Sequence, residues 1–95
     1  MWDNKNMTLN IDNQGLVTKK LVPQLTALTP GGAAYLNEAD FQQPNFPTTF
    51  YGKNYAKLRS IKRKYDPKDI FYGLTAVGSD EWTTKSADKR LCRVR

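Results

Sequence analysis

The sequence predicts a small α+β segment, with short extended stretches and one main amphipathic helix over about residues 50–65. Five Pro and six Gly divide the 95 residues into short pieces. Weak alternation of apolar and polar residues over 1–12, and a compact stretch over 33–40, are typical of extended backbone. Apolar side chains then recur at helical spacing along one face, at Tyr51, Tyr55, Leu58, Ile61 and Tyr65.

The N-terminal part predicts a short strand followed by a helix. Residues 1–12 read either as a strand or as the cut start of a longer element. Leu and Val at helical spacing predict a helix over 13–28. Because Pro23 lies inside this pattern, the helix must kink there or restart after Val22. The Pro-Gly-Gly that follows then ends it.

The main helix has predictable limits. Two prolines predict a loop over 41–49. Asp66 precedes Pro67, which disfavours helical backbone, and its side-chain oxygen can form a local turn. The apolar residues 70–72 are expected to pack back on the helix. After Gly78 the chain turns polar and offers three anchors, Trp82, Leu91 and Val94.

Composition limits what the chain can do alone. An apolar share of 39% is lean for a self-sufficient core, so we do not expect a robust independent fold. The net charge of +6 could indicate nucleic acid, an anionic membrane or a solvated face. Its concentration in 53–64 and 85–95 favours the solvated face. No apolar run is long enough to span a membrane, and the start lacks the apolar core of a signal peptide, which leaves the localisation open.

Several chemistries are excluded by residues that the sequence lacks. There is no His, so a Ser–His or Cys–His relay of the usual kind cannot form. One Cys without His excludes an intrachain disulfide and a conventional zinc site. Neither a Walker-type loop nor a dinucleotide fingerprint is present, so this chain should not hold a nicotinamide or flavin unaided.

The first candidate site is the stretch Tyr35-Leu36-Asn37-Glu38. In extended backbone Tyr35 and Asn37 face the same side and could reach one ligand, since an amide offers both a donor and an acceptor. The alternative is a core aromatic followed by a turn residue. Glu38 and Asp40 could form an acid–base pair, although most such carboxylates are simply solvated.

The predicted main helix interleaves tyrosines with Lys and Arg, a pattern that can serve single-stranded nucleic acid. The tyrosines, however, fall on the apolar stripe and the charges largely off it. This segregation favours an amphipathic helix docked on a larger body, and makes nucleic-acid binding the weaker interpretation.

An ordered set of motifs resembles one enzyme family. The set comprises Gly-Gly-Ala-Ala-Tyr-Leu-Asn-Glu-Ala-Asp over 31–40, Phe-Tyr-Gly-Lys-Asn-Tyr over 50–55, Tyr-Asp-Pro at 65–67, and the tail motifs Ala-Val-Gly-Ser-Asp-Glu-Trp and Arg-Leu-Cys-Arg. Over roughly 30–94 the chain resembles the C-terminal segment of the berberine-bridge-enzyme-like, FAD-linked oxidoreductases, and the fungal members most of all.

The resemblance implies a cofactor, partners and site residues. It implies FAD, an FAD-binding domain on which this segment packs, and a small-molecule substrate that transfers hydride to the flavin, with O2 as the final acceptor. Tyr35 would contact substrate and Asn37 the flavin. Relatives often carry a tyrosine base at the position of Glu38, so Glu38 would replace that base or the base would come from elsewhere. Asn54 would mark the start of the family's final helix and, with Asn37, bind the cofactor. Intact relatives are often secreted.

The same resemblance suggests how the chain is divided. Residues 1–29 would be a truncated remnant of the substrate domain, and 30–95 the berberine-bridge-enzyme-like C-terminal segment. Without the FAD-binding domain the segment should be inactive alone. Two alternatives stay open: a small basic module that docks on an acidic partner or nucleic acid, and a gene remnant without function.

Overall fold

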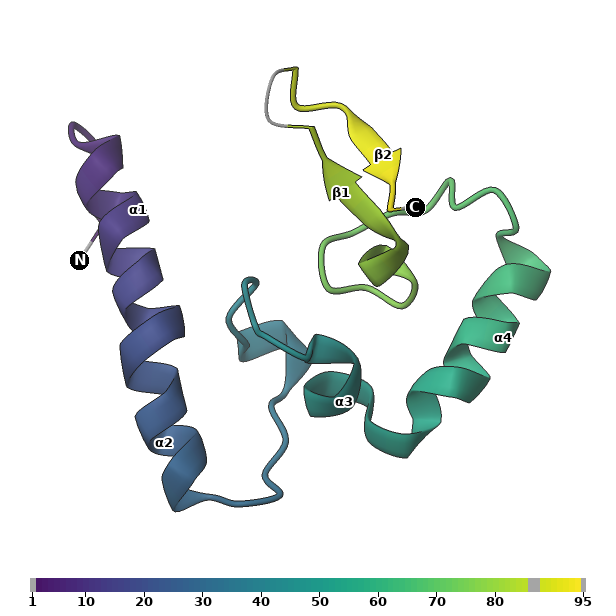
Figure 1. The fold of residues 1–95 in the computed structure, drawn as a ribbon, viewed down its shortest axis with the longest axis horizontal. Coiled ribbons are helices and arrows are strands. Elements are labelled where there is room, and N and C mark those ends of the chain that lie inside the picture. The colour runs from purple at the N-terminus through teal and green to yellow at the C-terminus, as the bar shows by residue number, and fades with distance from the viewer. Residues whose placement is uncertain (1, 86–87, 95) are drawn as a thin grey trace. The chain divides into compact units, whose positions relative to one another are not determined.

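A computed structural model describes residues 2–85 and 88–94. The chain divides into two compact units, 1–34 and 35–95, which are coloured purple to blue and teal to yellow in Figure 1. Each unit is described below by itself.

The first unit is a single helical column (Figure 1). Helix α1 (Met7–Leu16) leads through a π-helical turn (Val17–Leu21) into α2 (Val22–Leu28). The prediction of a strand over 1–12 is therefore wrong. The alternation of apolar residues there is short, and Asn6 caps the helix instead by accepting a hydrogen bond from the backbone N–H of Leu9 at 3.0 Å.

The predicted restart near Pro23 is confirmed to within one residue. Helix α2 begins at Val22, so Pro23 lies in its first turn, where a missing N–H is tolerated. The π-helical turn connects the two helices, with the N–H of Val22 donating to the carbonyl of Val17. The added residue per turn takes up the interruption without breaking the column.

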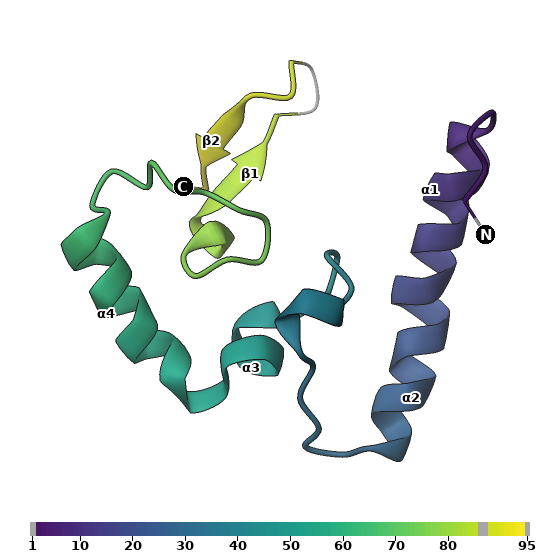
Figure 2. The ribbon, with the colours of Figure 1, turned by 180° about the vertical axis from the view of Figure 1, so that it is seen from behind.

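The second unit joins short helices to a small hairpin. It contains helices α3 (Phe46–Tyr51) and α4 (Tyr55–Tyr65) and strands β1 (Trp82–Thr84) and β2 (Leu91–Arg93). Three single 3-10 turns lie at Leu36–Glu38, Gly52–Asn54 and Ser79–Glu81. The strands pair antiparallel, with Thr83 opposite Cys92, and lie side by side in both views (Figure 2). The predicted α+β class is confirmed.

Two predicted boundaries are wrong in this unit. The helix over 50–65 is in fact divided at Gly52, whose φ of 53° and ψ of −139° suit glycine and interrupt regular helix. The predicted loop over 41–49 is correct only in its first part, because α3 begins at Phe46 with Pro47 in its first turn.

Predictions of secondary structure were less accurate for the short segments of the chain. The segment 33–40 is extended except at the 3-10 turn over Leu36–Glu38. The strands β1 and β2 were not predicted. The helix end at Asp66, in contrast, is confirmed.

The described residues contain no fully buried apolar side chain. Their buried polar residues are Asn10, Thr18, Asp66, Thr75 and Ser79, and Gly78 is also buried. Ile70 is 75% exposed and Phe71 80%, so the prediction that 70–72 pack back on the helix is wrong. The second unit is stabilised instead by a half-buried aromatic group and by the polar contacts described below. The aromatic group comprises Phe46, Phe50, Tyr51 and Tyr55.

Candidate functional site

Tyr35 and Asn37 meet on the surface of the second unit. Tyr35 is extended and directly precedes the 3-10 turn that carries Asn37. The side-chain N–H of Asn37 donates to the hydroxyl oxygen of Tyr35 at 2.9 Å. The two side chains therefore share one side, as predicted, although a turn rather than a continuous strand brings them together. Tyr35 is 68% exposed, which excludes the core-aromatic alternative for this unit.

Glu38 ends the same turn and is exposed. Its backbone N–H donates to the carbonyl of Tyr35 at 3.0 Å, so the backbone that carries both side chains is closed into one turn. The nearby Asp40 has a local structural role, because its carboxylate accepts the N–H of Gln42 at 2.9 Å.

Asn54 precedes the first residue of α4 and is exposed. Its side chain makes no capping hydrogen bond to the helix. The amide is thus available to a partner, but the structure does not bring Asn54 into contact with Tyr35, Asn37 or Glu38.

Two tyrosines link the α3–α4 region to the loop before β1. The hydroxyl of Tyr51 donates to the carbonyl of Thr75 at 3.0 Å, and burial raises the pKa of Tyr51. The hydroxyl of Tyr55 donates to the carboxylate of Asp80 and accepts the N–H of Gly78 at 3.1 Å. Burial, and then the Asp80 carboxylate, raise the pKa of Tyr55. Both phenols are therefore neutral hydrogen-bond donors at pH 7.

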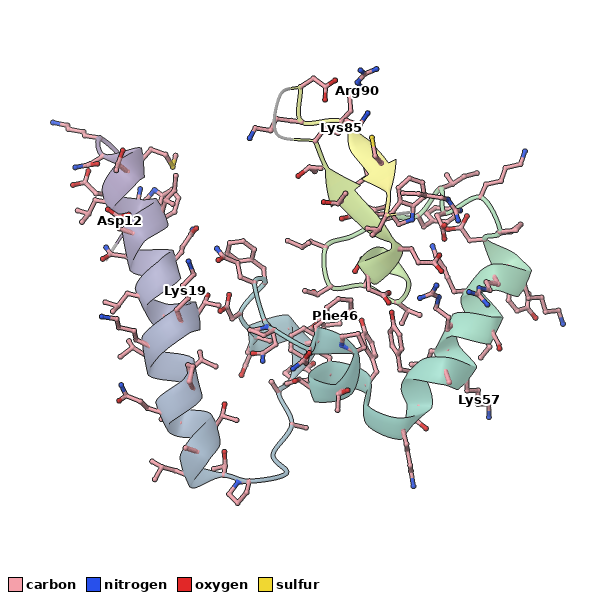
Figure 3. The ribbon with its side chains drawn as sticks, in the orientation of Figure 1. Asp12, Lys19, Phe46, Lys57, Lys85 and Arg90 are labelled. Atoms are coloured by element: carbon pink, nitrogen blue, oxygen red, sulfur yellow. The ribbon has the colours of Figure 1, made fainter. Side chains whose placement is uncertain are left out.

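The cations of α4 divide into paired and outward-facing residues. Arg59 forms ion pairs with Asp80, at 3.2 Å, and with Glu81. Its side chain is only 15% exposed, so these ion pairs contribute to the structure. Lys57 is exposed and projects away from α4 (Figure 3). The sequence did not reveal the role of Arg59, since its partners lie more than 20 residues away.

Asp66 organises the turn that follows α4. Its carboxylate accepts the N–H of Ile70 at 2.8 Å and of Phe71 at 3.0 Å, and it forms an ion pair with Lys62. Lys62 also donates to the carbonyl of Phe71 at 2.6 Å. The hydrogen bond from Lys62, followed by the two backbone N–H groups, lowers the pKa of Asp66 against the opposing effect of burial. The predicted Asp66 turn is confirmed.

Acid should release this turn. Because the pKa of Asp66 is lower in the folded than in the unfolded chain, its stabilisation is complete above the unfolded value, about 4, and is lost as the pH falls through the folded value. We expect the amide NMR signals of Ile70 and Phe71 to shift in that acidic window. In Asp66→Asn, this step should disappear. A midpoint at or above the ordinary aspartate value would contradict the assignment.

A second cluster closes the hairpin. The indole N–H of Trp82 donates to Asp69 at 3.3 Å, Arg93 pairs with Asp69 at 2.8 Å, and the Arg93 guanidinium lies 4.9 Å from the Trp82 ring centre. A cleft of about 260 Å³ lies beside it, lined by both cations and carboxylates, among them Arg59, Lys62, Asp66, Asp69, Glu81 and Arg93. Ion pairs of Arg59 with Glu81, Lys62 with Asp66 and Arg93 with Asp69 already join these charges, so we assign the cleft no ligand.

The described residues show neither a metal-binding cluster nor a membrane-spanning helix. No group of three or more His, Cys, Asp or Glu in 2–85 and 88–94 could hold a metal ion. Within the same part of the chain, no helix has the length and apolar character needed to cross a membrane.

Comparisons with known proteins give consistent results. Residues 34–77 match the family described as "Berberine and berberine like". The FAD-linked oxidoreductase sor8 of Hypocrea jecorina is 50% identical over 94 residues, which covers 98% of this chain and 16% of sor8. The FAD-linked oxidoreductase patO of Aspergillus clavatus is 58% identical over 79 residues, covering 83% of this chain and 14% of patO.

A solved structure agrees with these relatives. The crystal structure of the VAO-type flavoprotein MtVAO615 from Myceliophthora thermophila matches with a TM-score of 0.88 and 41% identity, over 98% of this chain and 17% of that one. The chain thus spans about 16% of the length of a relative such as sor8. The resemblance seen in the sequence is confirmed: residues 34–77 match the berberine and berberine-like family, and nearly the whole chain is similar to a part of the fungal FAD-linked oxidoreductases.

Proposed function

We propose that this chain forms one wall of the active site of an FAD-dependent oxidoreductase. In that reaction bound FAD would supply the acceptor for a hydride from the substrate carbon, with O2 as the final acceptor, and a base would take the proton of the substrate hydroxyl. The observation that carries the proposal is the 50% identity to an FAD-linked oxidoreductase over 98% of this chain. The exposed Tyr35–Asn37 pair supports it, because a ligand-facing pair should be open in this unit.

The donor set of this pair suits a flavin and a hydroxylated substrate. Asn37 uses an N–H toward Tyr35, so its carbonyl oxygen stays available as an acceptor. The Tyr35 oxygen accepts that N–H, which leaves its own O–H to donate elsewhere. Asn37 would therefore hold the mixed donor and acceptor edge of the flavin, with Asn54 as a second exposed amide. FAD, when bound, supplies the hydride acceptor.

The chain's own residues would manage the proton. Tyr35 binds and orients the substrate hydroxyl through its free O–H. Glu38, whose carboxylate is exposed one residue beyond Asn37, takes the hydroxyl proton as the carbonyl of the product forms.

The apolar turn after α4 supplies the docking contact. Asp66 holds the backbone of Ile70 and Phe71, yet both side chains are at least 75% exposed. A fixed backbone that presents exposed apolar side chains is suited to a partner surface. We infer that the partner is the FAD-binding domain of the enzyme, since this chain corresponds to 16% of a relative such as sor8.

Transfer of this chain into a relative tests the function. The chain should replace the matching segment of the Hypocrea jecorina sor8 protein, with the unmodified protein as control. We expect the chimera to bind FAD and to be reduced by the host's own substrate, and the isolated chain to show no flavin absorbance. A yellow isolated chain would contradict the proposed division of roles. A chimera that is folded and loaded with FAD, but is not reduced, would contradict the active-site role.

A further inference from the structure

The triplet Asn6-Met7-Thr8 has no role in the proposed function. It is the single Asn-X-Ser/Thr triplet in the sequence with X other than Pro, the pattern that accepts N-linked glycans. A triplet alone says little, because such patterns arise by chance. The folded environment of Asn6 adds the evidence that a triplet lacks.

The two polar atoms of the Asn6 side chain have different surroundings. Its carbonyl oxygen accepts the N–H of Leu9 at 3.0 Å and so caps α1. Its amide nitrogen has no hydrogen-bond partner within 2–85 and 88–94, and the residue is exposed. The backbone N–H of Asn6 is fixed separately by the carboxylate of Asp3 at 3.1 Å. The atom that a glycan would modify is thus the one that the fold leaves unused.

The chemistry of the modification preserves the cap. The amide nitrogen attacks the anomeric carbon of an oligosaccharide carried on a lipid diphosphate. The carbon–nitrogen bond forms, the lipid diphosphate leaves, and the nitrogen loses one proton. The product is still an amide, so its carbonyl oxygen can still accept the N–H of Leu9. The glycan therefore costs the helix none of its capping contact.

The position of Asn6 also separates it from the apolar residues of α1. Met7 and Ile11 are four residues apart and share one face of the helix. Asn6 lies on another face, where Asn10 is buried against the backbone of Asp3 but Asn6 itself stays exposed. A partner that covers Met7 and Ile11 would leave the Asn6 side open.

We propose that Asn6 is an N-glycosylation site whenever this chain passes through the endoplasmic reticulum. The test is expression of the full chain behind a cleavable secretion signal in yeast. The intact mass would be measured in cell extract and medium, with and without peptide N-glycosidase, so that a retained chain still reports. We expect one glycan, and after the enzyme a conversion of Asn6 to Asp.

Four variants sharpen the test. Asn6→Asp keeps a capping oxygen and removes the acceptor nitrogen, and Thr8→Ala keeps Asn6 but destroys the triplet. Both should carry no glycan, while Thr8→Ser and the control Asn13→Asp should keep it. Helix content measured by circular dichroism should stay the same in Asn6→Asp. An unglycosylated parent chain in both fractions, or a glycan that persists in Thr8→Ala, would overturn the proposal.

Discussion

Replacing Glu38 by Gln in the chimeric oxidoreductase should lower turnover by about 10²- to 10⁴-fold, the range for loss of a general base. Flavin occupancy should stay the same. Gln keeps the shape of the side chain but cannot accept a proton at pH 7. The affinity for substrate should change little, because Tyr35 still orients the hydroxyl. Stopped-flow reduction of the bound flavin under anaerobic conditions measures this step directly.

Two controls identify the source of the loss. Asp40→Asn removes a neighbouring carboxylate that already serves its own turn through Gln42, so turnover should stay close to that of the parent chimera. Tyr35→Phe should weaken substrate binding as well as turnover, since it removes the orienting O–H. Unchanged reduction in Glu38→Gln would place the base on another residue. An equal loss in Asp40→Asn would point to the local negative charge instead.

The local signals of the sequence predicted local structure well. Asp66 before Pro67 predicted both a helix end and a side-chain turn, because the two effects depend on adjacent residues. Pro23 fixed the restart of the first helical column for the same reason. The proximity of Tyr35 and Asn37 was predicted from strand geometry, and a 3-10 turn achieves it instead. Tyr35 and Asn37 are two positions apart, and this spacing places their side chains together both in a strand and in the 3-10 turn.

Long-range contacts could not be predicted in this way. Each strand of the hairpin has three residues, too few for a periodic pattern, and the next opposed pair is joined by a hydrogen bond from the backbone N–H of Lys85 to the carbonyl of Arg90. In the sequence, nothing distinguishes Arg59 from an ordinary surface cation. Its partners Asp80 and Glu81 come close to it only in the folded chain, where the loop before β1 lies against α4. The prediction that residues 70–72 pack on the helix used only their apolar character. Apolar character indicates that a side chain will be buried, but not whether the surface that buries it belongs to this chain or to a partner.

The exposed apolar turn over 70–72 gives the second large effect. Replacing Phe71 by Ser should leave the isolated chain almost unchanged and destabilise the chimeric enzyme by about 2 kcal/mol, the free energy of burying one large apolar side chain. In the isolated chain Phe71 is 80% exposed, so its removal deletes little contact. In the enzyme, the same side chain would be buried against the FAD-binding domain.

The contrast between the two contexts makes the test specific. The chemical shifts of the isolated chain should be the same outside the mutated turn, whereas the midpoint of denaturant unfolding of the chimera should fall. Lys68→Ala is the matched control, because it changes an exposed polar residue of the same turn and should affect neither. Asp66→Asn should lower stability in both contexts, since it releases the backbone of Ile70 and Phe71. A chimera unaffected by Phe71→Ser would mean that a different surface of this chain contacts the FAD-binding domain. The exposed side chains of α1 and α2 would be the next candidates.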